Sequence, residues 1–369
     1  YGSNILRRLR GYPLVQKTLY PKLSAYVVID WRMTSTALWA DYVLPAAGWY
    51  EKTEHKWGTP LMPYLHAGTK AASFYEAKSD WEICALLAKA VQERAGARGV
   101  KTFADRRGNE RRLDTVYDDF TMGGAYAEHD DEKVAAELVA LSSNLTGVEW
   151  PELKKRGYAR FTSTGASGFS VGNACDIAPD DTVSPFAHHV EKKQPYPTLS
   201  RRIQFYIDHP FYLELGEALP VHKDPPKAGG DYPLILTGGH TRWSIHSAWR
   251  DDARMLRLQR GEPVVYMSIA DAQARGIADG DLVEVRNDID RFRIRAKPAP
   301  TVRPGQLIIY HAWENYQFPD GKGFQNLIPS PLNPVELAGG EGHLRPISIC
   351  LQPSQNDRDT RVEVARVSA

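Results

Sequence analysis

Cysteine is scarce in this sequence. Cys84, Cys175 and Cys350 are the three among 369 residues, and they lie far apart, with no CxxC pair. An iron–sulfur cluster takes about four thiolates, so these cysteines cannot hold one by themselves. An odd number of cysteines also argues against a complete disulfide framework.

The sequence also lacks long apolar runs and an excess of either charge. No run reaches the ~18 residues that a membrane helix requires, so we expect no membrane span. Lys and Arg total 46 and Asp and Glu total 45, which leaves a formal net charge of +1. Nucleic-acid binders usually carry a concentrated basic face, whereas the basic clusters at 7–10 and 106–112 are short and separated. We therefore expect no nucleic-acid partner.

The N-terminal half has a mixed helix and strand pattern. An apolar, β-branched run at 23–31 predicts a buried strand of an α/β sheet, and a polar turn, a short helix and a second apolar run ending at Pro45 follow it. No GxGxxG follows such a strand, which disfavours an NAD-linked dehydrogenase. The stretch SDWEICALLAKAVQERA at 79–95 predicts an amphipathic helix, with Ser79 as N-cap and Glu82 completing a capping box. Further expectations are a loop region at 52–77, helices near 109–120 and 130–141, and a strand at 201–207.

The pattern changes after the stretch PVHKDPPKAGG at 220–230, which is typical of a linker. Short strand candidates recur at roughly ten-residue intervals and predict a small barrel. Ser268 to Gly276 predicts a helix with a serine N-cap and a glycine after its end. The strand candidates read YPLILT, EPVVYMS, DLVEVRND, DRFRIRAKPA, GQLIIYHAW and RVEVARV.

The stretch TGGHTRWSIHSAWRDD at 237–252 concentrates polar chemistry after a predicted strand. A metal site would use His240 and His246, but a gap of six fits neither a helix face nor a dense ligand cluster. A nucleophile would be Ser244 or Ser247, but no GxSxG is present. A large polar anion or heterocycle fits the residue types best, because glycines admit close backbone approach and Arg242 can bind a phosphate. A barrel loop with buried aromatics remains the alternative.

Three blocks in order resemble one known family. The stretch IADAQARGIADGDLVEVRNDIDRFRIRAKPAPTVRPGQLIIYHAW at 269–313 resembles the C-terminal domain of the molybdopterin oxidoreductases of the dimethyl sulfoxide reductase superfamily. DWRMTSTALWADYVLPAAGWYEKTE at 30–54 is similar to a segment of that family's nucleotide-binding domain, and YEAKSDWEICALLAKAV at 75–91 to the helix that follows it. The resemblance covers most of the chain and is weakest between positions 96 and 195.

The resemblance implies a fold and a division of the chain. We expect an α/β protein with a C-terminal six-stranded barrel of the double-psi type. Residues 1–48 would be the remainder of an α/β nucleotide-binding domain, and 49–220 a returning segment of a second α/β domain with helical and loop insertions. Residues 221–230 would be a linker and 231–369 the molybdopterin-binding barrel.

The resemblance also implies a cofactor, molybdenum held by two molybdopterin guanine dinucleotides. Backbone amides, hydroxyls and a few fixed charges suit such a ligand. The residues that match the family's cofactor-contacting positions are Asp30, Arg32, Thr34, Thr36 and Asp41 near the nucleotide end, His240, Thr241, Arg242, Trp243, Ser244, His246 and Ser247 in the pterin-facing loop, and Asn333 near the C-terminus. No protein ligand of molybdenum and no catalytic residue is assigned among these residues.

Within the family, the sequence resembles the type II catalytic alpha subunits most. The segments YHAWENYQF and PSPLNPVELAGGEGHLRP resemble ethylbenzene dehydrogenase and steroid C25 dehydrogenase most. This predicts hydroxylation of an activated C–H bond of an apolar small molecule with oxygen from water. The alternative within the family is reduction of an oxyanion such as perchlorate, chlorate, selenate or nitrate. The alternative of another class is a non-catalytic binding or scaffolding module.

The family's cluster-binding cysteines and the aspartate that ligates molybdenum do not occur in this sequence. We therefore interpret the chain as the C-terminal portion of a longer subunit, with a [4Fe–4S] cluster expected in the portion before it. The resemblance further implies an iron–sulfur beta subunit and a haem b gamma subunit as partners. It also implies export in folded form to the periplasm, on a signal outside this sequence.

Overall fold

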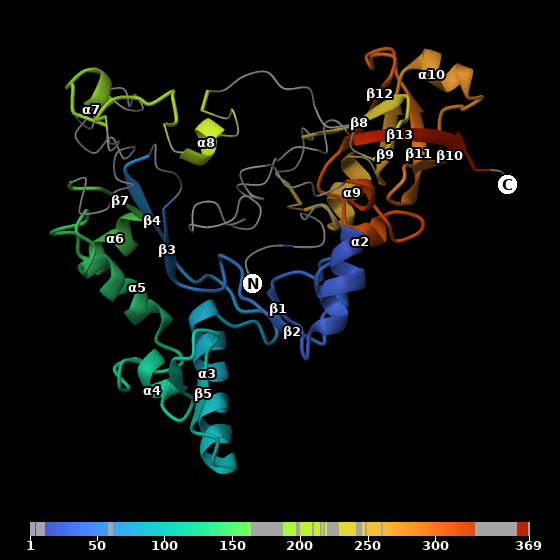
Figure 1. Ribbon diagram of the computed structural model, residues 1–369. Coiled ribbons are helices and arrows are strands. Elements are labelled where there is room, and N and C mark those ends of the chain that lie inside the picture. The colour runs from blue at the N-terminus through green and yellow to red at the C-terminus, as the bar shows by residue number, and fades with distance from the viewer. Residues whose placement is uncertain are drawn as a thin grey trace. The chain divides into compact units, whose positions relative to one another are not determined.

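The structure is a computed structural model that describes residues 4, 12–57, 62–163, 187–196, 200–208, 210–214, 216, 218–219, 229–240, 246–247, 249–259, 261–328 and 360–367 (Figure 1). The chain divides into two compact units. Unit 1 comprises residues 1–28, 33–43 and 205–369, and unit 2 comprises residues 29–32 and 44–204. The expected linker at 221–230 lies outside the described residues except for its last two glycines.

Unit 1 is dominated by a closed barrel, which confirms the predicted fold class. The strand order around the barrel is β10-β11-β9-β12-β8-β13. Pairs β8–β12 and β9–β11 are parallel, and the other neighbouring pairs are antiparallel. All six predicted strands are present: β8 (Leu234–Gly239), β9 (Val264–Met267), β10 (Leu282–Arg286), β11 (Arg291–Pro298), β12 (Gln306–Tyr310) and β13 (Thr360–Arg366).

The barrel forms because each strand alternates apolar and polar residues. In β11, Phe292, Ile294 and Ala296 are buried, and the arginines between them face solvent. Alternate residues of a strand point to opposite faces, so every apolar set lines the interior. Burial of each large side chain there contributes about 1.5–3 kcal/mol. The interior residues of the other strands are Leu234, Leu236, Val265, Met267, Val283, Val285, Leu307, Ile309, Val362 and Val364.

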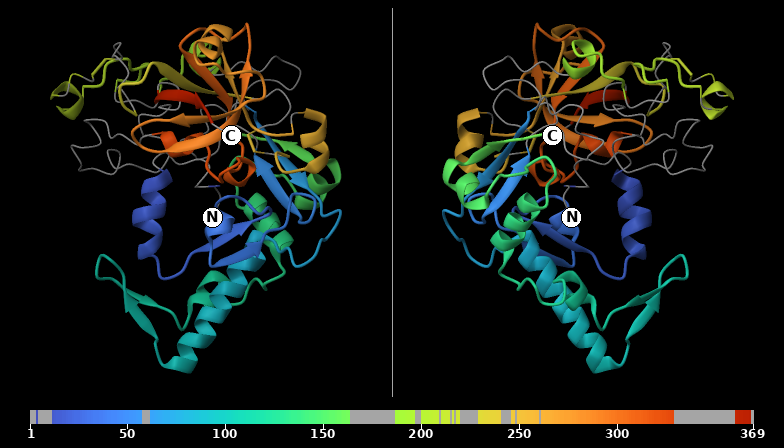
Figure 2. Two further views of the ribbon diagram at one scale, coloured as in Figure 1. Left: turned by 90° about the vertical axis from the view of Figure 1, so that its right-hand side faces the viewer. Right: turned by 90° about the vertical axis from the view of Figure 1, so that its left-hand side faces the viewer.

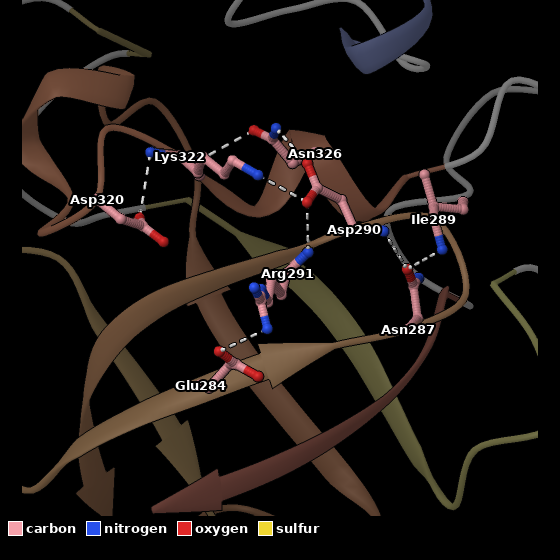
Figure 3. A network of polar contacts seen from close by, with 9 residues as sticks. Glu284, Asn287, Ile289, Asp290, Arg291, Asp320, Lys322 and Asn326 are labelled. Carbon is pink, nitrogen blue, oxygen red and sulfur yellow. Dashed lines mark hydrogen bonds and ion pairs between the residues drawn. The ribbon is translucent and has the colours of Figure 1, made fainter. Parts of the chain in front are cut away.

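A polar network fixes the turn between β10 and β11 to the segment that follows β12 (Figure 3). Asp290 accepts hydrogen bonds from Lys322 Nζ at 2.8 Å, Asn326 Nδ2 at 3.0 Å and the Arg291 amide at 2.9 Å. Although burial opposes it, these hydrogen bonds hold the pKa of Asp290 below its ordinary value. Asn287 Nδ2 donates to the Leu327 carbonyl at 2.9 Å, which anchors the same segment a second time.

The remaining elements of unit 1 are short. Helix α10 (Ile269–Ala274) begins as predicted, because Ser268 Oγ accepts from the Asp271 amide at 3.0 Å. The others are α2 (Tyr12–Leu14), η1 (Val15–Leu19), η2 (Tyr20–Lys22), η3 (Ala37–Trp39), α8 (Pro210–Glu214), α9 (Ala253–Gln259), η5 (Asn315–Gln317) and η6 (Phe324–Leu327). Strands β1 (Val27–Asp30) and β2 (Tyr42–Pro45) pair in a two-stranded sheet and have residues in both units.

Unit 2 consists of helices and two small sheets. Strands β3 (Glu54–Trp57), β4 (Tyr64–Gly68) and β7 (Tyr158–Arg160) form one sheet, and β5 (Thr102–Ala104) and β6 (Glu110–Arg112) form a hairpin. The hairpin stands out from the end of α3 in Figure 2. A small core gathers Leu65, Val139, Leu145, Leu153 and Phe161. The helices are α3 (Asp80–Arg98), α4 (Val116–Phe120), α5 (Asp131–Ala140), α6 (Trp150–Arg156) and α7 (Ala187–Val190).

The expected helices at 79–95 and 130–141 are confirmed as α3 and α5. Ser79 Oγ accepts from the Glu82 amide at 3.2 Å, as an N-cap does. Among the described residues, no helix combines the length and the apolarity that crossing a membrane would demand.

Of four other local expectations, two were confirmed only in part and two were wrong. The strand at 23–31 is shorter than expected, and only Val28 of β1 is buried. The region 52–77 contains β3 and β4 instead of loop alone, because pairing with β7 stabilises strands of irregular polarity. Of the helix expected near 109–120, only α4 at its end is present. Residues 110–112 form strand β6 instead, since Asp105 accepts the Arg107 and Asn109 amides and turns the chain into a hairpin. Residues 201–207 form no strand; their apolar side chains are exposed, and the part of the chain that the structure describes offers no strand beside them.

Candidate cofactor-binding site

Two parallel barrel strands end side by side and each delivers a histidine. Gly239 of β8 is in register with Tyr310 of β12, so His240 and His311 follow at the same edge. The carboxyl ends of adjacent parallel strands are a common place for ligands. A side chain at Gly239 would put Cβ 3.0 Å from the Tyr310 ring, so glycine permits the close approach of the two strands.

His240, His246 and His311 form what we call the histidine cluster. The ring centroids of His240 and His311 are 4.3 Å apart, and His246 lies 5.7 Å from the first and 5.5 Å from the second. His246 Nδ1 and His311 Nε2 are 3.3 Å apart. The side chains of His240 and His246 are exposed, and that of His311 is half-buried. The cluster therefore offers several imidazole nitrogens to a ligand at one point.

The orientation of His311 is fixed by the backbone of β8. Its Nδ1 lies 2.6 Å from the Gly239 carbonyl oxygen, and its amide donates to the same oxygen at 2.9 Å. A carbonyl oxygen can only accept, so Nδ1 carries the proton in this contact. In the neutral ring, Nε2 is then an acceptor. The ring that faces His246 thus has a defined tautomer.

The backbone around the cluster is strained. His246 has a φ of 48°, Trp249 of 62° and Ala312 of 82°, although none of them is glycine. Such conformations cost of order 1–3 kcal/mol each and persist where surrounding contacts hold them. Arg250 supplies such contacts. It is buried, its Nη2 donates to the His311 carbonyl at 3.0 Å, and its guanidinium lies 4.4 Å from the Trp313 ring.

A buried carboxylate joins the segment after β12 to residues near the N-terminus within unit 1. Glu314 is fully buried and accepts from the Ser35 amide at 2.9 Å and the Ser35 hydroxyl at 2.7 Å. Asn4 Nδ2 donates to its two oxygens at 2.8 and 2.9 Å. The Asn315 amide in turn donates to Ser35 Oγ at 2.8 Å. Segments about 280 residues apart in sequence are thereby held together.

Two buried amide side chains after β12 have polar atoms without a hydrogen-bond partner among the described residues. Asn315 has both its Oδ1 and its Nδ2 in this state, and Gln325 has its Oε1. Unpaired buried polar atoms are costly and usually mark a place that something else satisfies. A ligand rich in donors and acceptors suits these atoms and the histidine cluster.

The predicted site residues fall into three groups. The first group lies in unit 1 and includes His240, His246 and Ser247, of which the two histidines meet in the cluster. It also includes Thr34 and Thr36, which are buried on either side of Ser35. Asp41 is also in unit 1, where it accepts from the Tyr26 amide at 2.7 Å. Asp30 and Arg32 lie in unit 2, and the Arg32 amide donates to Asp30 Oδ1 at 3.3 Å. Thr241, Arg242, Trp243, Ser244 and Asn333 lie outside the described residues.

Sequence reasoning missed His311, Ser35 and Glu314. His311 and Glu314 stand in the segment YHAWENYQF, whose resemblance to branches of the family assigns no role to either residue. A signal was available for His311, because two predicted strands of the barrel are each followed closely by histidine. No sequence signal pairs Ser35 with Glu314, since their contact depends on the tertiary fold.

Two family models match the chain. The molydopterin dinucleotide binding domain matches residues 234–339, and the molybdopterin oxidoreductase model matches residues 14–90. The first begins at β8 and contains the histidine cluster, and the second contains residues 34–36. The chain belongs to the molybdopterin oxidoreductases.

Several relatives of this molybdopterin oxidoreductase chain are alpha subunits. It is 37% identical to the respiratory nitrate reductase subunit alpha of Haloferax mediterranei, with 99% of this chain and 38% of the relative covered. It is 34% identical to the chlorate reductase subunit alpha of Ideonella dechloratans, with 99% and 39% covered. It is 38% identical to the dimethylsulfide dehydrogenase subunit alpha of Rhodovulum sulfidophilum, with 86% and 34% covered. The chain thus spans less than half the length of these relatives.

A solved structure supports the fold independently. Acetylene hydratase from Pelobacter acetylenicus superimposes with a TM-score of 0.60 at 18% identity, and the match covers 99% of this chain and 43% of that one. At this identity the likeness concerns the fold alone. The two family models indicate that the cofactor is a molybdopterin guanine dinucleotide, in the paired form that binds molybdenum. The unpaired amides and the clustered imidazoles fit the many donors and acceptors of such a pterin.

Proposed function

We propose that this chain is the cofactor-holding portion of a molybdenum oxidoreductase catalytic subunit that reduces an oxyanion, such as nitrate or chlorate. The geometry that carries the cofactor assignment is the histidine cluster at the paired ends of β8 and β12. The substrate class is supported by the nitrate and chlorate reductase relatives, which match 99% of the chain. These relatives favour oxyanion reduction over the hydroxylation of an apolar C–H bond.

The role of the chain's own residues is to bind and orient the cofactor. When bound, the cofactor supplies the molybdenum centre at which oxygen and electrons are exchanged. His311 is held by Gly239 so that its Nε2 can accept a hydrogen bond, and His240 and His246 present further imidazole nitrogens beside it. Fixed polar groups of this kind need little reorganisation when the ligand binds.

Residues 33–36 contribute by supporting this arrangement. The contact of Ser35 with Glu314 fixes the backbone three residues beyond His311. We propose that Thr34 and Thr36, which flank Ser35, lie near the same cofactor. Asp30, Arg32 and Asp41 remain proposed contacts of its nucleotide end. The proposed contacts of its pterin are Thr241, Arg242, Trp243, Ser244 and Ser247, and Asn333 remains a proposed contact of the cofactor.

The partners and the location follow from the same proposal. The relatives are named as alpha subunits, so we propose that the complete protein works with further subunits that carry electrons. An iron–sulfur beta subunit and a haem b gamma subunit are the proposed partners, and the periplasm is the proposed location.

The cofactor part of the proposal is tested by replacing His240 with Gln in the complete catalytic subunit. Molybdenum per subunit is measured by mass spectrometry, and guanine nucleotide is measured after acid hydrolysis. The variant should lose both in parallel, whereas His66→Gln should lose neither, since His66 is exposed on β4 of unit 2. Equal retention in the two variants would contradict the assignment.

The substrate part is tested on the assembled holoenzyme. Reduced viologen should be oxidised when nitrate or chlorate is added, and an aromatic hydrocarbon with an oxidising dye should give no turnover. Turnover of the hydrocarbon in the absence of oxyanion reduction would restore the hydroxylase prediction. A holoenzyme with cofactor but with neither activity would contradict both substrate assignments while leaving the cofactor assignment intact.

A further inference from the structure

A cavity in unit 2 lies between the end of helix α7 and residues 200–203. Its volume is about 490 Å³, within the range of roughly 300–1,000 Å³ that is typical of small-molecule sites. Its lining includes three cationic side chains, Lys193, Arg201 and Arg202, and two aromatic rings, His189 and Tyr196. All five residues belong to unit 2, and neither family model extends to them. The cavity is therefore a second candidate site, formed by residues that the cofactor assignment does not use.

The lining of this cavity carries charge of one sign. Among the described residues, no aspartate or glutamate lines it, although the whole chain has a formal net charge of only +1. The Lys193 ammonium donates to the Val190 carbonyl at 2.6 Å, and since it has three N–H donors, two remain for a ligand. The exposed Arg201 guanidinium has no ion-pair or hydrogen-bond partner among the described residues. An anionic ligand would therefore meet two cations with unused donors.

Both of these cations have an unusual backbone conformation. The φ angle is 54° at Lys193 and 59° at Arg201. This left-handed region is unfavourable for residues with a Cβ atom, and residues held in it gather at ligand-binding sites. The Tyr196 amide donates to the Arg201 carbonyl at 3.1 Å, and the His189 ring stacks on the Tyr196 ring with centroids 4.0 Å apart. These contacts hold the lining in place before a ligand arrives, so that binding costs little rearrangement.

We propose that this cavity binds a phosphate group. The planar guanidinium of Arg201 can pair with two phosphate oxygens at once, and the ammonium of Lys193 adds a second positive charge. A phosphate monoester carries a charge of about −1.5 to −2 at pH 7, which suits a lining of several cations better than a singly charged carboxylate does. Inorganic phosphate would fill only part of the volume, so the organic part of a monoester has room beside the Tyr196 ring. The proposal does not rest on the proposed function, because the cavity shares no residue with the cofactor site.

The experiment measures binding to the complete catalytic subunit with its cofactor in place, by equilibrium dialysis against three labelled probes. The probes are inorganic phosphate, ribose 5-phosphate and adenosine 5′-monophosphate. We expect saturable binding of one molecule per subunit, tighter for at least one monoester than for inorganic phosphate. Inorganic phosphate bound as tightly as either monoester would support the phosphate site and identify free phosphate as its ligand.

Three substitutions locate the binding in the cavity. Arg201→Gln removes the guanidinium and should weaken binding by about 10-fold or more, because hydrogen bonds to charged groups are the strong ones. Arg201→Lys keeps the charge without the planar pair of donors and should lose less. Lys193→Gln should also weaken binding. Both side chains are exposed, so their replacement should leave folding intact.

The matched control is Arg94→Gln, which removes an exposed cation from α3 in the same unit and should bind the probes as the unchanged subunit does. The absence of saturable binding of any probe at millimolar concentration would overturn the proposal. Affinities of Arg201→Gln and Lys193→Gln equal to that of Arg94→Gln would overturn it too. Either result leaves the cofactor assignment untouched, because molybdenum and guanine nucleotide are measured separately on the same subunit.

Discussion

Removal of the Glu314 carboxylate tests how residues 33–36 are held against the segment after β12. In Glu314→Ala the Ser35 amide and hydroxyl lose an acceptor at 2.9 and 2.7 Å but stay buried. A buried donor left without an acceptor costs about 1–3 kcal/mol. The half-buried Asn4 side chain can turn to water and adds little. With two such donors, we expect the free energy of unfolding of unit 1 to fall by roughly 2–6 kcal/mol.

The isosteric variant Glu314→Gln should be far less damaging. Its remaining oxygen can accept both Ser35 hydrogen bonds, and its amide nitrogen then faces Asn4. Asn4 can turn its amide over to meet it, because Thr36 Oγ1, now 2.6 Å from Asn4 Oδ1, can accept as well as donate. The variant therefore loses mainly the extra strength that charge gives to a hydrogen bond, and we expect a cost of ~1–2 kcal/mol.

Urea unfolding followed by tryptophan fluorescence measures both variants, with the steepness of the transition checked for a change in cooperativity. Glu262→Ala is the control, because that side chain is 52% exposed and forms a surface ion pair with Arg295 on the same barrel. It should change stability by no more than about 0.5 kcal/mol. The reasoning is refuted if the alanine variants at 314 and 262 cost the same, or if Gln at 314 costs as much as Ala.

Three further predictions concern other parts of the chain. Ala312→Gly should leave stability unchanged or raise it, because φ of 82° suits glycine, whereas Ala296→Gly in the middle of β11 should cost ~1 kcal/mol; equal losses in thermal unfolding would contradict the strain at Ala312. Ser79→Ala should destabilise α3 by ~1 kcal/mol through loss of the cap on the Glu82 amide, detected as faster amide exchange in the first turn; unchanged exchange would speak against it. The hydrogen bond from Lys89 lowers the pKa of Glu128 from 4.5 to about 2, so its contribution to stability is present above pH 4.5 and is lost as pH falls toward 2. In Lys89→Met, an NMR titration of Glu128 should show a midpoint raised toward the ordinary value, held partly down by the remaining hydrogen bonds from the backbone and Tyr117, and an unchanged midpoint would show that Lys89 is not the main cause.

The barrel could be predicted from the sequence because its strands carry their own signal. Alternation in Arg291–Pro298 and the cap at Ser268 are local patterns, and each determines an element without knowledge of its neighbours. The expectation of a strand at 201–207 failed because a local pattern alone does not make a strand. Its alternation is as clear as that of β11, but a strand also needs a partner, and the described residues provide none there.

The candidate site was predicted only in part. His240 and His246 could be singled out because they lie in one short stretch. His311 joins them through the parallel pairing of β8 with β12, a choice of neighbours that the sequence of either strand does not encode. The contact of Ser35 with Glu314 depends on two segments meeting across most of the chain, and short polar residues of these types give no warning of such a partner.

The position of β13 in the barrel has a consequence for the order in which the protein assembles. β13 pairs with β8 on one side and with β10 on the other. The barrel therefore closes only when residues 360–366 pair with β8, which lies about 130 residues earlier in the sequence. Until they arrive, both neighbours present unpaired backbone, a condition that invites association with other chains. The barrel edge formed by β8, the strand that His240 follows, therefore becomes paired on both sides only late in synthesis.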